Sequence, residues 1–268
     1  KTTYAELEVL VNRAAKGLQT LGASKGTRIG LCLPNTPYSV IFYFAILKIG
    51  ATVVNFNPLY VEREIAFQID DSETEIMVTM DLEVIYPKIA AMLTQAPSLK
   101  TIVVCPMSQI LPPIKGLLFR VLKKKDIATV RENQAVTYHQ LMNNDGHPEN
   151  VDIDVDEDIA VPQYTGGTTG QPKGVMVEHG SVINMSQFIA DTHGLLEGKT
   201  ALLFSNYVFD ASVFELFPCL LSGSKVVLAS TREINNPLLL LQLINAQGIQ
   251  KAFLPPALVQ LLVEELST

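Results

Sequence analysis

One stretch of the chain combines residue types that could hold a phosphate group: YTGGTTGQPKG, at residues 164–174. Glycine lets backbone N–H groups approach an anion closely, and threonine hydroxyls add further donors. Lys173 contributes a positive charge suited to phosphate. We therefore expect this stretch to form a loop that binds a polyphosphate through Thr165, Gly166, Gly167, Thr168, Thr169, Gly170 and Lys173.

The order of residues departs from two common phosphate-binding patterns. A Walker loop requires Gly-Lys-Ser/Thr, whereas Pro172 precedes Lys173 here and Gly174 follows it. The stretch does not match the dinucleotide-binding fingerprint either. A flexible surface linker rich in glycine and threonine is the plain alternative, and composition alone leaves both interpretations open.

The apolar pattern on either side of the loop alternates between strands and helices. In the first half, helical spacing is found at 3–22, 39–50, 62–72 and 83–96, and short apolar runs typical of strands at 27–35, 51–58, 75–80 and 100–106. The alternation predicts an α/β fold with largely parallel sheets flanked by helices. The strands are apolar throughout, as sheets covered on both faces require.

The alternation stops between residues 106 and 158 and then resumes. A strand is expected at 159–165, then the loop, then a helix at 181–196; further strands are expected at 201–209, 224–230 and 251–256, and helices at 212–223, 237–248 and 257–266. We therefore expect two α/β subdomains. The first covers residues 1–157, with a basic insertion and an acidic linker, and the second covers 158–268 and opens with the phosphate loop. In open α/β sheets ligands bind at the carboxyl ends of strands, where this loop falls.

Composition limits the classes of function. The chain has 268 residues, of which 48% are hydrophobic and 18% charged, enough for a sizeable core. A net charge of −7 argues against nucleic-acid binding, which needs Lys and Arg to neutralise phosphates. Cys32, Cys105 and Cys219 have no metal or redox spacing, so we expect small buried side chains in a reducing, cytoplasmic setting. No apolar run reaches spanning length and no signal peptide opens the chain.

The longer stretch YTGGTTGQPKGVMVEH closely resembles the signature of the adenylate-forming superfamily, which includes acyl-CoA synthetases and the adenylation domains of peptide synthetases. LPNTP, LKIGATVVNFNPLY, FDAS and FLPPALVQLL resemble other motifs of this family, in the same order, so the resemblance covers nearly the whole chain. It implies activation of a carboxylate by ATP and Mg²⁺ to give an acyl-adenylate. The resemblance also implies that the acyl group is then transferred to a thiol. This acceptor thiol belongs to coenzyme A or to the phosphopantetheine of a carrier protein.

The two halves of the chain resemble different branches of the family. The first half is similar to a bacterial long-chain fatty acyl-CoA ligase, and the part from the signature onward is similar to a peptide synthetase adenylation domain. The resemblance therefore implies a small-molecule carboxylate that is a fatty acid or an amino acid. A natural mosaic, a recombinant and an assembly artefact would all give this chimeric pattern.

Asp210 is the residue on which the substrate class depends. In peptide synthetases the matching aspartate pairs with the α-ammonium group of an amino acid, so the resemblance implies a substrate-binding role. The alternative is a helix cap: Asp210 or Ser212 could begin the next helix, and Ser212 with Glu215 fits a capping box.

The family places a ribose-binding acid, an adenine-binding aromatic motif and a catalytic lysine after the point where this chain stops. We therefore expect an N-terminal fragment that binds ATP weakly and is inactive alone, and we assign no catalytic residue and no metal ligand. The alternatives are a nucleotide-binding or a structural fragment without turnover.

The segment 111–125 alternates Leu, Phe and Val with Lys and Arg. Such a basic amphipathic stretch can lie on an anionic membrane surface, which would make a cytoplasmic protein membrane-associated. The alternative is an ordinary exposed helix whose lysine stems cover apolar surface.

Overall fold

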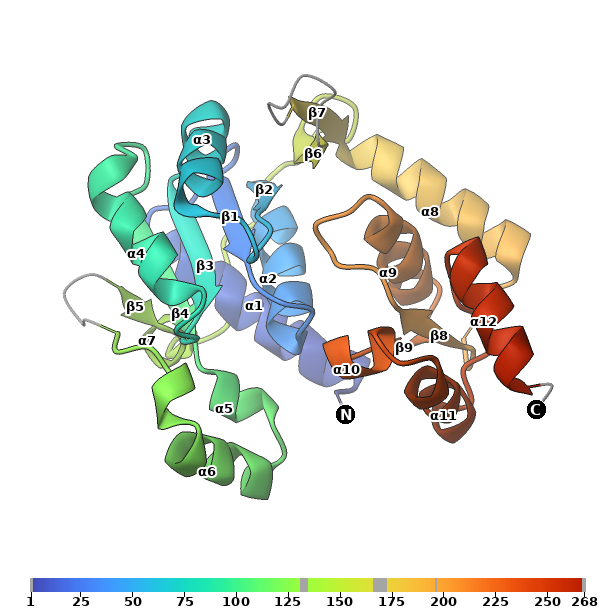
Figure 1. Ribbon diagram of the computed structural model, residues 1–268. Helices are drawn as coiled ribbons and strands as arrows, with labels where there is room; N and C mark the ends of the chain where they lie inside the picture. Colours follow the sequence, from blue (N-terminus) through green and yellow to red (C-terminus); the bar gives the residue numbers. More distant parts are fainter. Residues whose placement is uncertain (1, 131–134, 166–172, 196, 267–268) are drawn as a thin grey trace. The chain divides into compact units, whose positions relative to one another are not determined.

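The computed structural model describes residues 2–130, 135–165, 173–195 and 197–266. The chain divides into two compact units, Lys1–Glu178 and His179–Thr268 (Figure 1). The sequence predicts a domain boundary between residues 157 and 158, whereas the two compact units meet between 178 and 179. The compact units are defined by contacts, so the predicted domain boundary stays a prediction.

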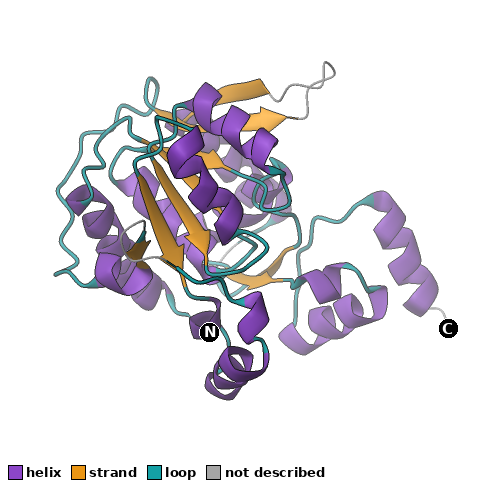
Figure 2. Cartoon of the chain, turned by 60° about the vertical axis from the view of Figure 1, so that its left-hand side comes forward, coloured by secondary structure: helices purple, strands orange, loops and turns teal. Residues whose placement is uncertain are grey.

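A five-stranded parallel sheet forms the centre of the first unit (Figure 2). Its strands are β1 (Arg28–Cys32), β2 (Thr52–Asn55), β3 (Ile76–Met80), β4 (Thr101–Cys105) and β5 (Val136–Thr137), in the order β2-β1-β3-β4-β5. Every residue of β2 and β3 is buried, as the apolar runs predicted. The expected α/β fold with a parallel sheet is therefore confirmed.

Helices cover both faces of this sheet (Figure 1). They are α1 (Tyr4–Thr20), α2 (Pro37–Lys48), α3 (Glu62–Ser72) and α4 (Tyr86–Gln95). The chain passes from β1 to β2 in one direction along the sheet, and from β2 to β3 in the other. Because such crossovers are right-handed, α2 and α3 must lie on opposite faces. Local sequence supports these elements: α1, for example, begins at a capping box in which Thr3 and Glu6 exchange hydrogen bonds.

Several elements lie in the region where the sequence pattern was interrupted. They are α5 (Met107–Ile110), α6 (Pro113–Leu122), a single 3-10 turn at Lys124–Asp126, β5 and α7 (Tyr138–Met142). The strand β5 was missed because it has two residues, too few for a periodic pattern, and its position depends on pairing with Val103 and Val104 of β4.

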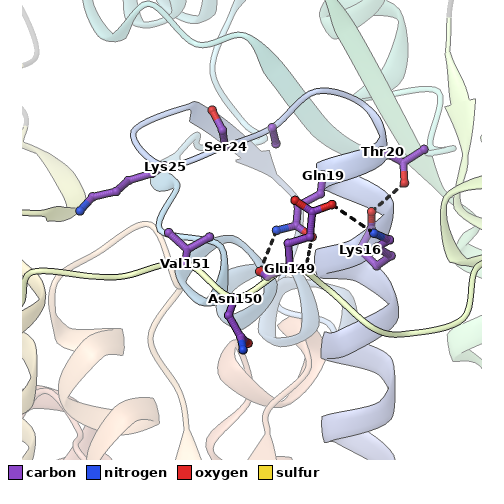
Figure 3. Close-up of a pocket in the computed structure, with 9 residues that line it drawn as sticks. Lys16, Gln19, Thr20, Ser24, Lys25, Glu149, Asn150 and Val151 are labelled. Carbon is purple, nitrogen blue, oxygen red and sulfur yellow. Dashed lines mark hydrogen bonds and ion pairs between the residues drawn. The ribbon is translucent and has the colours of Figure 1, made fainter.

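The acidic linker is fastened to the first unit. The Gln19 side chain donates to the carbonyl of Glu149 at 3.0 Å and accepts from its N–H at 2.8 Å, and Lys25 pairs with Asp158 at 2.6 Å. These contacts border an open pocket of about 520 Å³ (Figure 3). Lys16 and Glu149 at its wall pair with each other at 3.6 Å, which adds a further contact between α1 and the linker.

A β-hairpin ends the first unit. Its strands are β6 (Ile159–Thr165) and β7 (Lys173–Glu178), which pair antiparallel. The Thr52 hydroxyl of β2 donates to the carbonyl of Ile159 at 3.0 Å and joins the hairpin to the sheet. The sequence-based expectation that a helix follows the loop was incomplete, because β7 comes first and α8 begins only at His179.

The second unit is smaller and is also α/β. Its elements are α8 (His179–His193), β8 (Thr200–Leu203), α9 (Ala211–Leu221), β9 (Lys225–Leu228), α10 (Thr231–Ile234), α11 (Pro237–Gln247) and α12 (Pro256–Leu266). β8 and β9 pair in parallel. The strand expected at 251–256 is wrong, since only an isolated bridge joins Lys251 to Ala201. Throughout the described part of the chain, no helix has the length and hydrophobicity needed to cross a bilayer.

Candidate functional site

The two ends of the predicted phosphate loop are held together by the hairpin. Thr165 is the last residue of β6, Lys173 is the first of β7, and the two are paired across the strands. The other predicted phosphate-binding residues, Gly166, Gly167, Thr168, Thr169 and Gly170, lie outside the described residues. The structure therefore gives the base of the loop, with Lys173 at its exit.

Lys173 is exposed at this base. No described residue forms an ion pair with its ammonium group. An exposed cation that no described residue neutralises is suited to an anionic ligand.

Tyr164 anchors the hairpin one residue before the loop. Its hydroxyl donates to Asp71 Oδ2 of α3 at 2.6 Å, and its ring packs against the core of the first unit. Burial, followed by the contact with Asp71, raises the pKa of Tyr164, so the phenol remains a neutral donor. Gly174 lies opposite, and a Cβ there would be only 3.2 Å from the tyrosine ring, so glycine permits this approach.

This anchoring role of Tyr164 escaped the sequence analysis. The residue stands inside the recognised motif, but its partner on α3 is distant in sequence, so only the fold brings the two together. The signal available was an aromatic residue at the end of a buried strand, which predicts packing and not the hydrogen bond.

Glu215 organises the candidate substrate region of the second unit. From α9, its Oε2 accepts the N–H groups of Phe204 and Ser205, both at 2.8 Å, and its Oε1 accepts the Ser205 hydroxyl at 2.8 Å. Only 4% of Glu215 is exposed. Burial raises the pKa of this carboxyl, and the three hydrogen bonds counteract part of that rise. Glu215 thus fixes the start of the loop that leads from β8 to Asp210.

Asp210 lies at the N-terminus of α9 and is exposed. One of its carboxylate oxygens, Oδ1, accepts the N–H of Ala211 at 2.8 Å. The capping interpretation is therefore correct for Asp210. It leaves the predicted substrate role open, since the carboxylate also faces solvent.

The predicted capping box between Ser212 and Glu215 is wrong. The Ser212 hydroxyl instead donates to the carbonyls of Phe209, at 2.7 Å, and Tyr207, at 3.1 Å. Glu215 is engaged by the preceding loop instead. The sequence spacing fitted a box, but Asp210 is the residue that caps the helix, so Ser212 and Glu215 each lie two positions too late to form it.

The three cysteines are buried and free, as expected of small apolar side chains. Burial raises the pKa of Cys32 to about 12 and that of Cys219 to about 11, which makes both thiols unreactive at neutral pH. Over the described ranges, His, Cys, Asp and Glu form no group of three or more that could hold a metal ion.

Comparison with known proteins agrees with this architecture. The family model described as AMP-binding enzyme matches residues 1–268. A long-chain-fatty-acid–CoA ligase of Bacillus subtilis is 34% identical over 211 residues, which are 76% of this chain and 37% of that protein. Malpinin synthetase of Mortierella alpina is 30% identical over 258 residues, which are 96% of this chain and 3% of that protein.

A solved structure shares the fold. The long-chain-fatty-acid-CoA ligase of Archaeoglobus fulgidus superposes with a TM-score of 0.79 at 23% identity, covering 99% of this chain and 47% of that one. The chain thus spans less than half the length of each of these relatives, and they come from both branches that the motifs resemble. Because the family model extends over the entire sequence, the chain belongs to the AMP-binding enzyme family.

Proposed function

We propose that the protein to which this chain belongs activates a carboxylate with ATP, giving an acyl- or aminoacyl-adenylate and pyrophosphate. The observation that carries the proposal is the hairpin closed by Thr165 and Lys173, with the exposed cation at its mouth, in a chain of the AMP-binding family. The loop would hold the β- and γ-phosphates through backbone N–H groups, threonine hydroxyls and Lys173.

In this proposal a carboxylate oxygen of the substrate attacks the α-phosphorus, and the bond to pyrophosphate breaks. The loop residues, with Lys173, would contribute binding and charge neutralisation, which account for much of the catalysis in phosphate chemistry. Tyr164 would support the base of the loop through Asp71. Mg²⁺ would enter with the phosphates of the nucleotide, since it commonly binds through substrate phosphates and retained waters.

We propose a fatty acid or an amino acid as the substrate, in line with the two groups of relatives. Asp210 would favour an amino acid, because an exposed carboxylate can pair with an α-ammonium group. The proposed acceptor is the thiol of coenzyme A or of the phosphopantetheine on a carrier protein. Three buried free thiols suit a reducing, cytoplasmic setting. A further proposed partner is a membrane surface, contacted peripherally by residues 111–125.

The test is ATP–pyrophosphate exchange by the full-length protein with a panel of fatty acids and amino acids. We expect exchange that depends on one class of carboxylate. If the substrate is an amino acid, Asp210→Asn should abolish its selection while leaving ATP binding, measured by calorimetry, unchanged. ATP binding without exchange for any carboxylate would support a nucleotide-binding role instead, and no ATP binding would overturn the proposal.

A further inference from the structure

The helix α6 presents its apolar side chains to solvent. Ile114, Leu117, Leu118 and Val121 follow the spacing i, i+3, i+4, i+7 and so form one stripe, which Leu122 widens. Their exposed fractions are 76%, 66%, 49%, 68% and 74%. An amphipathic helix of a folded protein normally turns such a stripe toward the core. Here the stripe, residues 114, 117, 118, 121 and 122, is left exposed by every residue that the structure describes.

The opposite side of α6 is the side that packs on the protein. Gly116 is buried there, and a Cβ at this position would lie 2.4 Å from the carbonyl oxygen of Ser108 on α5. The Arg120 guanidinium donates from Nε to the Ser108 hydroxyl at 2.9 Å. The helices α5 and α6 lie side by side (Figure 1). Because Gly116 and Arg120 both contact Ser108 on α5, the opposite side of α6, which carries the stripe, faces outward.

The support reaches back to the central sheet. The N–H of Met107, the first residue of α5, donates to Asp81 Oδ1 at 2.6 Å, just after β3. The Tyr38 hydroxyl donates to the carbonyl of Pro106 at 3.2 Å. The stripe is therefore connected to the sheet of the first unit through α5.

The charges around the stripe are strongly biased. The basic cluster consists of Lys115, Arg120, Lys123, Lys124 and Lys125, which are all exposed, and of these only Arg120 lies on the side of α6 that packs on α5. These are five of the 20 Lys and Arg residues of a chain whose net charge is −7. Asp126 pairs with Lys123 at 3.3 Å and is the sole acid between 111 and 126. An apolar stripe flanked by cations, in an otherwise acidic protein, complements a surface that is both apolar and anionic.

We infer that α6 is an interfacial helix that docks this protein on an anionic bilayer. The helix lies parallel to the membrane, the stripe enters the boundary between headgroups and acyl chains, and the lysines that follow it contact lipid phosphates. A helix of ten residues is too short to span a bilayer, so the contact is peripheral. The inference specifies the membrane surface named under the proposed function, and it does not depend on carboxylate activation.

A tryptophan probe tests the insertion directly, because the chain contains no Trp. With Leu118→Trp, vesicles containing phosphatidylglycerol should shift the emission to shorter wavelength, whereas phosphatidylcholine vesicles should not. Leu59→Trp is the control, since Leu59 is 84% exposed and lies outside the stripe. An unshifted spectrum for Leu118→Trp, or equal shifts for both variants, would overturn the inference.

Paired substitutions separate the two parts of the surface in a vesicle sedimentation assay. Leu117→Asp with Val121→Asp should abolish binding, while Leu59→Asp with Val84→Asp, which also replaces an exposed Leu and an exposed Val, should not. Lys124→Glu with Lys125→Glu should weaken binding at least about 25-fold, because each cation near an anionic membrane contributes about a fivefold factor.

Lys48→Glu with Lys251→Glu makes the same change in net charge at exposed positions elsewhere and should bind like wild type. Binding that is indifferent to the stripe, or equal on neutral and anionic vesicles, would contradict the inference. A second contradicting outcome is a protein that does not bind vesicles and forms a dimer in light scattering, if Leu117→Asp with Val121→Asp converts this dimer to a monomer. The stripe would then be covered by a second copy of the chain. ATP binding is an independent readout, so its loss would count against the proposed function alone.

Discussion

Glu215 holds Ser205 by two hydrogen bonds, from the backbone N–H and from the hydroxyl, both 2.8 Å long. The carboxylate comes from the buried face of α9, and Ser205 begins the loop that returns to the same helix. The Glu215 side chain thereby joins the start of the loop to the helix in which the loop ends, and Asp210 lies at this second end. Glu215 is a positioning residue in this arrangement.

Replacement of Glu215 by alanine should destabilise the second unit. The N–H groups of Phe204 and Ser205 would lose their acceptor in a site where the side chain is 4% exposed. We expect a loss of about 2–4 kcal/mol in the free energy of unfolding, measured by urea titration. Glu215→Gln is the matched variant, since its amide oxygen can still accept both N–H groups, and it should lose much less. Equal losses for the two variants would contradict the hydrogen-bonding role.

The same carboxyl should give the stability of the protein a characteristic dependence on pH. Burial raises the pKa of Glu215 above its ordinary value of 4.5. The folded chain then binds this proton more tightly than the unfolded chain, so the contribution of Glu215 to the free energy of unfolding falls as pH rises from 4.5 through the folded-state pKa. Glu215→Gln removes the titration. The free energy of unfolding of Glu215→Gln minus that of wild type should therefore increase over this pH interval. A difference that stays constant would show that burial does not raise the pKa of Glu215.

Tyr164→Phe should loosen the base of the phosphate loop. It removes the hydroxyl that donates to Asp71 at 2.6 Å and leaves the ring in place. Because the pair is partly exposed, we expect a loss of about 0.5–1.5 kcal/mol in the free energy of unfolding, together with faster hydrogen exchange in β6. Tyr60→Phe is the control, a tyrosine packed on the same core whose hydroxyl bonds to no described residue. Similar effects of both changes would argue against anchoring through Asp71.

Lys173→Ala should weaken ATP binding without changing stability. The side chain is exposed and pairs with no described residue, so its removal leaves no buried group unsatisfied. A charge-assisted hydrogen bond to phosphate contributes about 1.5–3 kcal/mol, which corresponds to roughly a ten- to hundredfold loss of affinity in calorimetry. Lys48→Ala changes an exposed lysine elsewhere and should bind ATP as wild type does. Unchanged affinity in Lys173→Ala would refute the phosphate-binding role.

The sequence by itself determined the class of fold and the family. The spacing of apolar residues in a strand or a helix depends only on neighbouring residues, so the sequence predicted the alternation of strands and helices from β1 to β4. The ordered motif around Lys173 identified the AMP-binding family without any coordinates. The sequence also offered Asp210 and Ser212 as alternative caps of the next helix, since capping depends on neighbouring residues, and Asp210 is the one that caps it.

Only the tertiary structure decided which distant groups meet. Tyr164 finds Asp71 on another element, and β5 exists because β4 offers its edge. Glu215 matched a local capping pattern, yet burial against the returning loop directed it to Ser205. The sequence showed that the segment 111–125 is amphipathic, but not which face of α6 is exposed. That choice rests on the packing of Gly116 against Ser108, a contact between two helices that no local pattern encodes.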